Sequence, residues 1–344
     1  MSASSFQPRS LVPTNAGSRR SVPAFSFSRG VPALVWAALV ALPIWALASG
    51  EPYYVTVVAR ILIYAIAATA LHFALGLGGL VSLGHALFVG IGAYAVALPV
   101  FYGQTSGWLH LAIALVACSL VAAITGAISL RTSGLGFLMI TLAFAQMGYF
   151  LFVSLKQYGG DDGLAIPVHS QFAGWGLDGS AKVYFAALVL LALLTYWMAR
   201  LKRAPFGMVL LAAEQNSRRV LASGLTVLHY RLAVYVLSGA VCGIAGVLLA
   251  NLSAYASPAT FSLQVSGDLL VMLVIGGVGF TSGPLLGALS YMVLEELLKG
   301  TTDHWMVILG PAIVLVALLG RGGLCGWLER LDARRAAASS KAGS

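Results

Sequence analysis

Apolar runs long enough to cross a lipid bilayer alternate with short polar breaks along most of the chain. A membrane-spanning helix needs about 20 predominantly apolar residues, and several of these runs reach that length. The predicted segments are 31–49, 54–75, 80–101, 109–129, 134–154, 182–199, 230–251, 266–280, 284–299 and 303–320. Lipid offers backbone groups no hydrogen-bond partner, so each segment is expected to be a helix. The pattern predicts an all-α polytopic membrane protein of about ten spans.

One internal stretch, the polar island from Arg200 to Arg231, interrupts this pattern. The chain as a whole is 59% hydrophobic and only 9% charged, with a mean hydropathy of +0.91. The island nevertheless holds Arg200, Lys202, Arg203, Glu214, Arg218, Arg219 and Arg231. Such a segment cannot lie in hydrocarbon, so it must face water on one side of the membrane.

The spacing within the island predicts a short amphipathic helix over 206–223. Its apolar or small residues fall on one stripe: Leu210, Ala213, Ser217 and Val220. Glu214 precedes Arg218 by four residues, the order that favours an ion pair on a helix. Gly207 and Gly224 bracket the stretch, and Gly224 suits a helix end. Three interpretations stay open from the residues: a helix on the lipid surface, a plain basic loop, or a helix that docks into a soluble partner.

The basic residues gather in four regions of the chain. These are the first 30 residues, Arg131 after the fourth segment, the polar island, and the stretch after 320; together they hold 16 of the 20 lysines and arginines. The positive-inside rule places all four in the cytoplasm, and two cytoplasmic termini require an even number of spans. The net charge of +9 follows from this topology, so no nucleic-acid partner is expected.

The segments divide the chain into a disordered cytoplasmic tail (1–30), a transmembrane domain (31–320) and a second cytoplasmic tail (321–344). The only long loop expected on the opposite side is 155–181, which contains Asp161 and Asp162. It is a docking surface for another protein, with these two acids as candidate contacts, or a lid, or a solvated connector.

Two glycine-rich breaks interrupt the apolar segments, one in each half of the chain. The first runs over 76–79 and continues to Ser82 and His85, and the second runs over 276–283. Interrupted segments at comparable positions point to a transport pathway, but glycines also permit close helix packing. The candidate pathway residues are Ser82, His85, Gln146, Gly276, Gly277 and Gly283. For His85 and Gln146, a structural hydrogen bond between helices is the competing interpretation.

No catalytic constellation is present in the sequence. The chain lacks a phosphate loop, an HExxH motif, a GxSxG motif and a CxxC motif, so we expect no metal site, no cofactor and no ATP site. Transport driven by ATP would need the nucleotide on another polypeptide. An alternative is a stand-alone secondary carrier or channel for small solutes, which would need His72 or His85 as a coupling group. A membrane-embedded enzyme would need a polar cluster that the segments lack.

Several motifs in the same order resemble one family over roughly residues 55–320. They are Gly79–Ala86 with Gly90–Tyr94, Leu130–Arg131 through Ile140–Gln146, Gly159–Leu164, and Gly276–Pro284 with Gly287–Ala288. With these the chain resembles the inner-membrane permease of branched-chain amino acid ABC transporters, in particular the LivM type.

The resemblance implies a role for the polar island and a set of partners. The segment 200–230 corresponds to the family's cytoplasmic coupling segment, with Gly207, Glu214, Asn216, Arg218 and Gly224 as coupling residues. Ala213 departs from the family, which usually has a basic residue before the glutamate. The implied partners are a second permease of the LivH type, two ATP-binding subunits that hold the ATP, and an extracytoplasmic solute-binding protein. The implied substrates are leucine, isoleucine and valine, or a related solute such as urea or an amide.

Overall fold

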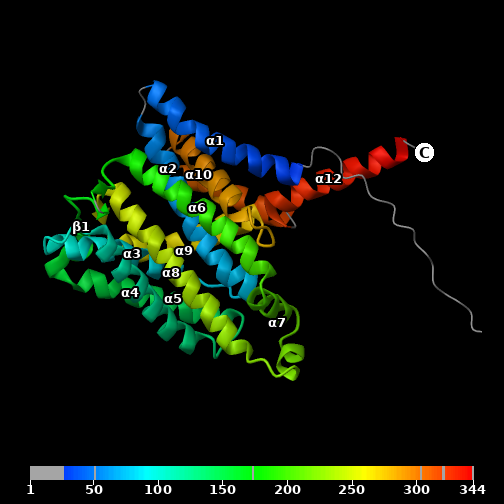
Figure 1. The fold of residues 1–344 in the computed structure, drawn as a ribbon, viewed down its shortest axis with the longest axis horizontal. Coiled ribbons are helices and arrows are strands. Elements are labelled where there is room, and N and C mark those ends of the chain that lie inside the picture. Colours follow the sequence, from blue (N-terminus) through cyan, green and yellow to red (C-terminus); the bar gives the residue numbers. More distant parts are fainter. Residues whose placement is uncertain (1–26, 50–51, 173, 303, 320–321, 343–344) are drawn as a thin grey trace, which may run out of the picture.

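The computed structural model describes residues 27–49, 52–172, 174–302, 304–319 and 322–342. This part of the chain folds into an all-α bundle, as predicted (Figure 1). Its α-helices are α1 (Phe27–Ser49), α2 (Pro52–His72), α3 (His85–Phe101), α4 (Gly107–Ser129), α5 (Leu135–Ser154), α6 (Ser180–Arg203), α7 (Pro205–Ala222), α8 (Val227–Ser253), α9 (Leu263–Gly276), α10 (Gly283–Thr301), α11 (Trp305–Leu319) and α12 (Gly323–Ala342).

Each of the ten predicted segments overlaps one helix, although 80–84 and 277–280 are not helical, and the helix predicted in the polar island is α7. Among the described residues, five helical stretches are long and apolar enough to cross a bilayer: Tyr53–Leu77, Gly107–Ser129, Leu135–Ser154, Ser180–Arg203 and Val227–Ser253. The apolar stretches in α1, α3 and α9 are shorter. The 14 residues of α9 rise only about 21 Å, so ten complete spans stay a prediction.

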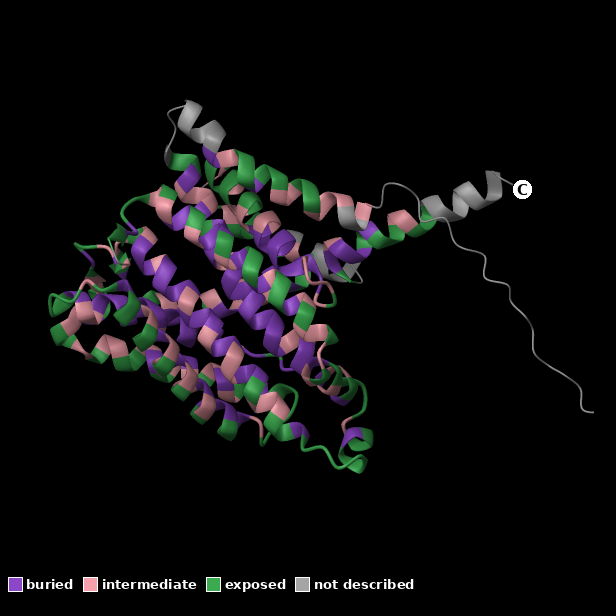
Figure 2. Ribbon diagram, viewed as in Figure 1, coloured by how far each residue is buried: buried purple, intermediate pink, exposed green. Residues whose placement is uncertain are grey.

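Three helices, α2, α3 and α8, form the centre of the bundle. Their side chains are buried on nearly all sides (Figure 2), as expected for helices that are apolar all round. Glycines bring α3 and α8 into backbone contact. A Cβ added at Gly92 would lie 2.1 Å from the carbonyl oxygen of Gly243, and one at Gly246 would lie 2.1 Å from that of Val89. No larger residue fits this interface without moving a helix.

The helices α4, α5 and α6 flank this core, and each leaves apolar side chains uncovered. Val116 on α4, Met147 on α5 and Val189 on α6 are each about two-thirds exposed. In a membrane protein such faces suit contact with lipid or with another membrane subunit.

The two ends of the bundle differ in structure. One end carries four short strands, with β1 (Leu164–Ala165) paired to β4 (Tyr255–Ala256) and β2 (Gln171–Phe172) paired to β3 (Trp175–Gly176). The opposite end carries α7, and the start of α12 lies on the same side of the bundle (Figure 1).

The basic regions within the described residues meet at the end that carries α7. Leu130 and Thr132, which flank Arg131, line one pocket with Arg231. The carbonyl of Gly322, which follows α11, lies against Gly277. This grouping agrees with the charge rule, whereas the compartment that this end faces stays a prediction. The tail 1–26, Glu51, Asp303 and Arg321 lie outside the described residues.

The stretch after 320 contains a helix that the sequence analysis did not predict. This helix, α12, packs on α1, α9 and α10, and the backbone N–H of Phe27 donates a hydrogen bond of 2.7 Å to Asp332 Oδ1. The packing ties both ends of the described chain to each other on the side of the bundle that carries α7.

Candidate functional site

The first glycine break changes the form of α2 before the chain enters α3. Helix α2 continues into a π-helix, η1 (Phe73–Leu77), and regular helix resumes only at His85. Gly79 has a φ of +63°, a conformation that glycine adopts without cost. The intervening backbone packs against other helices: the N–H of Leu83 donates to Thr141 Oγ1 on α5 at 3.3 Å.

The second glycine break is a tight turn between α9 and α10, in which the three predicted glycines contact one another. A Cβ at Gly276 would lie 1.8 Å from the carbonyl oxygen of Gly283, and one at Gly283 would lie 2.3 Å from that of Gly277. Gly277 itself has a φ of +106°. Glycine is therefore required here for close backbone approach and for conformation.

The two breaks lie against each other in the fold. A Cβ at Gly76 in the first break would come within 3.1 Å of the carbonyl oxygen of Val278 in the second. The buried ring of His72 lies over Gly76. The structure therefore brings together interruptions that are about two hundred residues apart in the chain.

The polar island contacts both breaks. On α7, Glu214 packs on the first break, because a Cβ at Gly79 would lie 3.1 Å from Glu214 Cγ. At the end of α6, Lys202 Nζ donates a hydrogen bond of 3.2 Å to the carbonyl of Gly279 in the second break. The pKa of the Glu214 carboxyl is raised by burial against the bundle, and the positive charge of Arg231 partly offsets this effect.

The predicted amphipathic stripe of α7 is confirmed, because Leu210, Ala213 and Val220 are buried. Close packing explains Gly207, where a Cβ would lie 2.1 Å from the carbonyl oxygen of Leu201. Gly224, with a φ of +85°, follows the last turn as expected for a helix stop.

The predicted ion pair between Glu214 and Arg218 is wrong. It is absent among the ion pairs of the described residues, because the helix is broken between the two side chains. Asn216 has a φ of −156° and a ψ of 91°, and its Oδ1 accepts a hydrogen bond of 3.2 Å from the N–H of Arg219. Asn216 thus caps a second short helical turn, and the i,i+4 register across it is lost.

The cap gives a first prediction. Replacing Asn216 with alanine should cost about 1 kcal/mol of local helix stability, so backbone amides in 217–223 should exchange hydrogen about fivefold faster. Asn216→Asp keeps an acceptor and should exchange at the original rate, as should the neighbouring variant Gln215→Ala. Hydrogen–deuterium exchange of this peptide measures the difference, and equal protection in Asn216→Ala would rule out the cap.

His85 is a hydrogen-bonded core residue. Its Nε2 lies 2.7 Å from the hydroxyl of Ser238 on α8, and that hydroxyl donates to the carbonyl of Ala70 on α2. Because the serine proton is used in this bond, the histidine donates through Nε2–H. Ser82 is also buried and accepts a hydrogen bond from the N–H of Gly84 at 3.1 Å. These contacts favour the structural interpretation of His85.

The remaining predicted residues lie away from the breaks or are only partly buried. Gln146 is half-buried on α5, and its side chain makes no hydrogen bond to the described residues. Asp161 and Asp162 are exposed in the 3₁₀ turn η3 (Gly160–Asp162), directly before β1 at the end opposite α7. A docking role for the two acids is therefore sterically open and stays a prediction.

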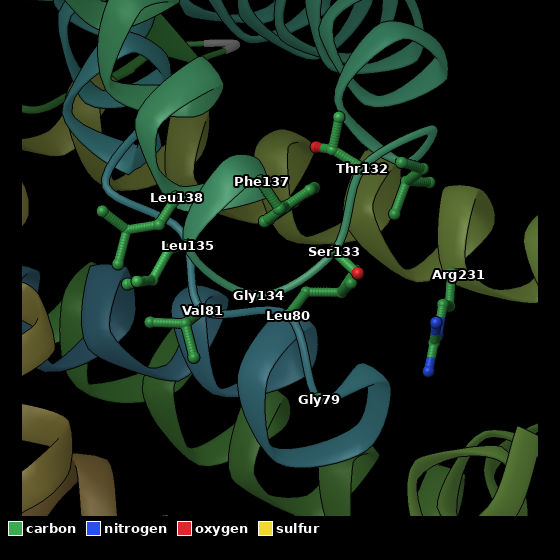
Figure 3. A pocket seen from close by; sticks show the side chains of 11 residues that line it. Gly79, Leu80, Val81, Thr132, Ser133, Gly134, Leu135, Phe137, Leu138 and Arg231 are labelled. Atoms are coloured by element: carbon green, nitrogen blue, oxygen red, sulfur yellow. The ribbon is translucent and has the colours of Figure 1, made fainter.

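A pocket of about 480 Å³ lies beside the first break, at the end that carries α7. One wall comes from the break (Gly79, Leu80, Val81), and a second comes from the turn between α4 and α5 with the start of α5. Arg231 on α8 lies at one side, opposite Val81, Leu135 and Leu138 (Figure 3). No local motif in the sequence marks Arg231 as part of a cavity, so the charge pattern alone gave it a topological role.

Residues 53–318 match the family described as the branched-chain amino acid transport system permease component. The chain belongs to this family of ABC transporter permeases. Among curated proteins it is 29% identical over 287 residues to the high-affinity branched-chain amino acid transport system permease protein LivM of Escherichia coli K12, a match that covers 76% of this chain and 68% of that protein.

Two further relatives show the range of the family. The probable branched-chain amino acid transport permease protein LivM of Methanocaldococcus jannaschii is 25% identical, over 69% of this chain and 78% of its own length. The L-arabinose transport system permease protein AraH of Escherichia coli K12 is 30% identical, over 43% of this chain and 44% of its own length. No solved structure matches the permease.

Proposed function

We propose that this permease is one membrane subunit of an ABC importer for branched aliphatic amino acids. It works beside a second permease and is driven by two separate ATP-binding subunits, since the sequence has no phosphate loop. A solute-binding protein delivers the substrate at the end that carries β1 to β4, where Asp161 and Asp162 are exposed. Both termini and α7 face the cytoplasm in this arrangement.

The contact of the polar island with both glycine breaks carries the proposal. Glu214 packs on Gly79, and Lys202 is hydrogen-bonded to Gly279. A soluble subunit that moves α7 would therefore displace the two places where the spanning helices are interrupted. A stand-alone carrier does not need a water-exposed helix, such as α7, that contacts both glycine breaks.

In this proposal the glycine breaks are the element that changes its packing during transport. At Gly276 and Gly283 the backbones meet without intervening side chains, so a small shift of α10 against α9 changes the whole contact. We propose that closure of the ATP-binding subunits pushes α7, that Glu214 and Lys202 pass this movement to the breaks, and that the pathway then opens to the other side.

The proposed substrate is an amino acid rather than a sugar, because the match to LivM covers 76% of this chain and the match to AraH covers 43%. The family contains both kinds of transporter by name. A sugar needs several paired donors and acceptors along its path. Here the buried hydroxyls of Thr69, Ser238 and Ser266 are already bonded to backbone groups of α2 and α3. Those three hydroxyls are not free to pair with a sugar, whereas His72, His85, Tyr94 and Ser129 keep buried side-chain atoms without a partner among the described residues.

Reconstitution tests the proposal. The permease with its partner subunits is placed in proteoliposomes, and uptake of radiolabelled leucine, arabinose and urea is measured with the solute-binding protein. We expect leucine uptake that requires ATP and the ATP-binding subunits. Uptake driven by a proton gradient without those subunits would contradict the ABC mechanism, and ATP-driven uptake of arabinose or urea alone would contradict the substrate.

A further inference from the structure

The pocket beside the first glycine break has no role in the coupling mechanism above. It lies at the end that carries α7, between the break after α2, which the mechanism requires to move, and the starts of α5 and α8. Its volume of about 480 Å³ is in the range of small-molecule sites.

The lining divides into an apolar part and a single cation. The apolar part comprises Leu80, Val81, Leu130, Leu135, Phe137 and Leu138, and the hydroxyl residues Thr132 and Ser133 lie in the turn between α4 and α5. Arg231 supplies the positive charge from the side that faces the apolar part (Figure 3). This is the layout expected for a ligand with one anionic group and an aliphatic body.

Arg231 is not neutralised by the described residues. Its Nε is buried and has no hydrogen-bond partner among them. Glu214 acts on it electrostatically, but the two make no ion pair in this part of the chain. The buried Nε is itself shielded from a ligand, so a carboxylate in the pocket would accept hydrogen bonds from the terminal N–H groups of this guanidinium.

We infer that this pocket binds a branched aliphatic amino acid on the side to which it is released. Its carboxylate is held by Arg231, and its side chain lies on Leu80, Val81 and Leu135. This inference rests on the proposed function, because it takes the transported solute as the ligand. One guanidinium with no second cation favours a carboxylate over a phosphate, and the leucine-rich wall disfavours a sugar.

The amino group of the ligand would lie on the Glu214 side of the pocket. Gly79 lines the pocket, and the Glu214 side chain packs directly on it. A zwitterion can therefore bridge Arg231 on α8 and Glu214 on α7. An occupied pocket would join the coupling segment to the first break and resist their separation, so accumulated product would slow the transport cycle.

An equilibrium binding experiment tests the inference. It measures the binding of radiolabelled L-leucine to the purified transporter complex without its solute-binding protein. We expect saturable binding that Arg231→Gln weakens by about tenfold or more, with partial recovery in Arg231→Lys. Arg131→Gln removes an exposed arginine from the neighbouring turn that does not line the pocket, and it should bind leucine like the unmodified complex.

Competition by analogues of leucine identifies which groups of the amino acid the pocket recognises. Competition by 4-methylpentanoate, which lacks the amine, should be weaker than by leucine, and 3-methylbutylamine, which lacks the carboxylate, and L-arabinose should not compete. Leucine binding that is absent, or unchanged in Arg231→Gln, would overturn the inference, as would equal competition by the amine. ATP-driven leucine uptake, measured in the same preparation, is scored separately: uptake without pocket binding rejects this site and leaves the proposed function intact.

Discussion

The Gly276→Ala variant is expected to yield little or no folded permease. Its added methyl group would lie 1.8 Å from the carbonyl oxygen of Gly283 and 3.0 Å from the N atom of Gly287. Both obstacles are backbone atoms, which cannot rotate away as a side chain can. Overpacking a core costs roughly 1–3 kcal/mol even where side chains yield, against a total stability of about 5–15 kcal/mol. Folded yield is measured by size-exclusion chromatography of the detergent extract.

A glycine three residues away supplies the matched control. At Gly279 an added Cβ has nothing within 4 Å, and its φ is not in the left-handed region. Gly279→Ala should therefore keep a normal yield, and the backbone carbonyl that accepts the Lys202 hydrogen bond is unchanged. A monodisperse Gly276→Ala protein at the yield of Gly279→Ala would show that α9 and α10 do not need this close approach.

The helices of this permease were predictable because lipid offers no hydrogen-bond partners to the backbone, and a helix satisfies its backbone groups internally. Each long apolar run had to satisfy its own hydrogen bonds as a helix, and the positions of α2, α4 and α8 follow from that rule. The buried stripe of α7 was predictable from the spacing of Leu210, Ala213 and Val220 alone. The apolar runs do not determine which helices reach across the bilayer, because α9 is short and α10 carries charges near its end.

The break in α7 had a local signal that helical periodicity concealed. Asparagine is among the preferred N-cap residues, and Asn216 stands three residues before the N–H that it binds. The stripe on both sides of it continues in phase, so periodicity alone favoured one unbroken helix and an ion pair across it. The tertiary packing of Glu214 on Gly79 shows instead that this carboxylate faces the first break.

The spacing of residues along the chain could not predict which motifs contact one another in the folded protein. Val278 against Gly76, Lys202 on Gly279 and Arg231 in the pocket all join residues from distant parts of the chain. Local periodicity carries no information about such pairs. The motifs located the breaks and the coupling segment, and only the fold shows that they touch.

The contact between Glu214 and the first break predicts that Glu214→Arg abolishes ATP-driven uptake while membrane insertion stays intact. The larger cationic side chain cannot pack on Gly79 in the same way, and it places a second positive charge near Arg231, whose field already acts on this position. Insertion should survive because residue 214 is exposed at the end of the bundle. We expect uptake in proteoliposomes to fall by about tenfold or more, since coupling energies of about 1–3 kcal/mol are typical between linked sites.

The next residue supplies the control, because Gln215 is exposed on the same turn and does not pack on Gly79. Gln215→Arg adds the same side chain one position away and should retain most of the uptake. Glu214→Gln keeps the shape and removes the charge, so it separates packing on the break from attraction to Arg231. Loss of uptake in Glu214→Arg with ATP hydrolysis preserved would indicate uncoupling of the ATP-binding subunits from the pathway. Normal uptake in Glu214→Arg would instead remove this residue from the coupling mechanism and leave Lys202 on Gly279 as the next contact to test.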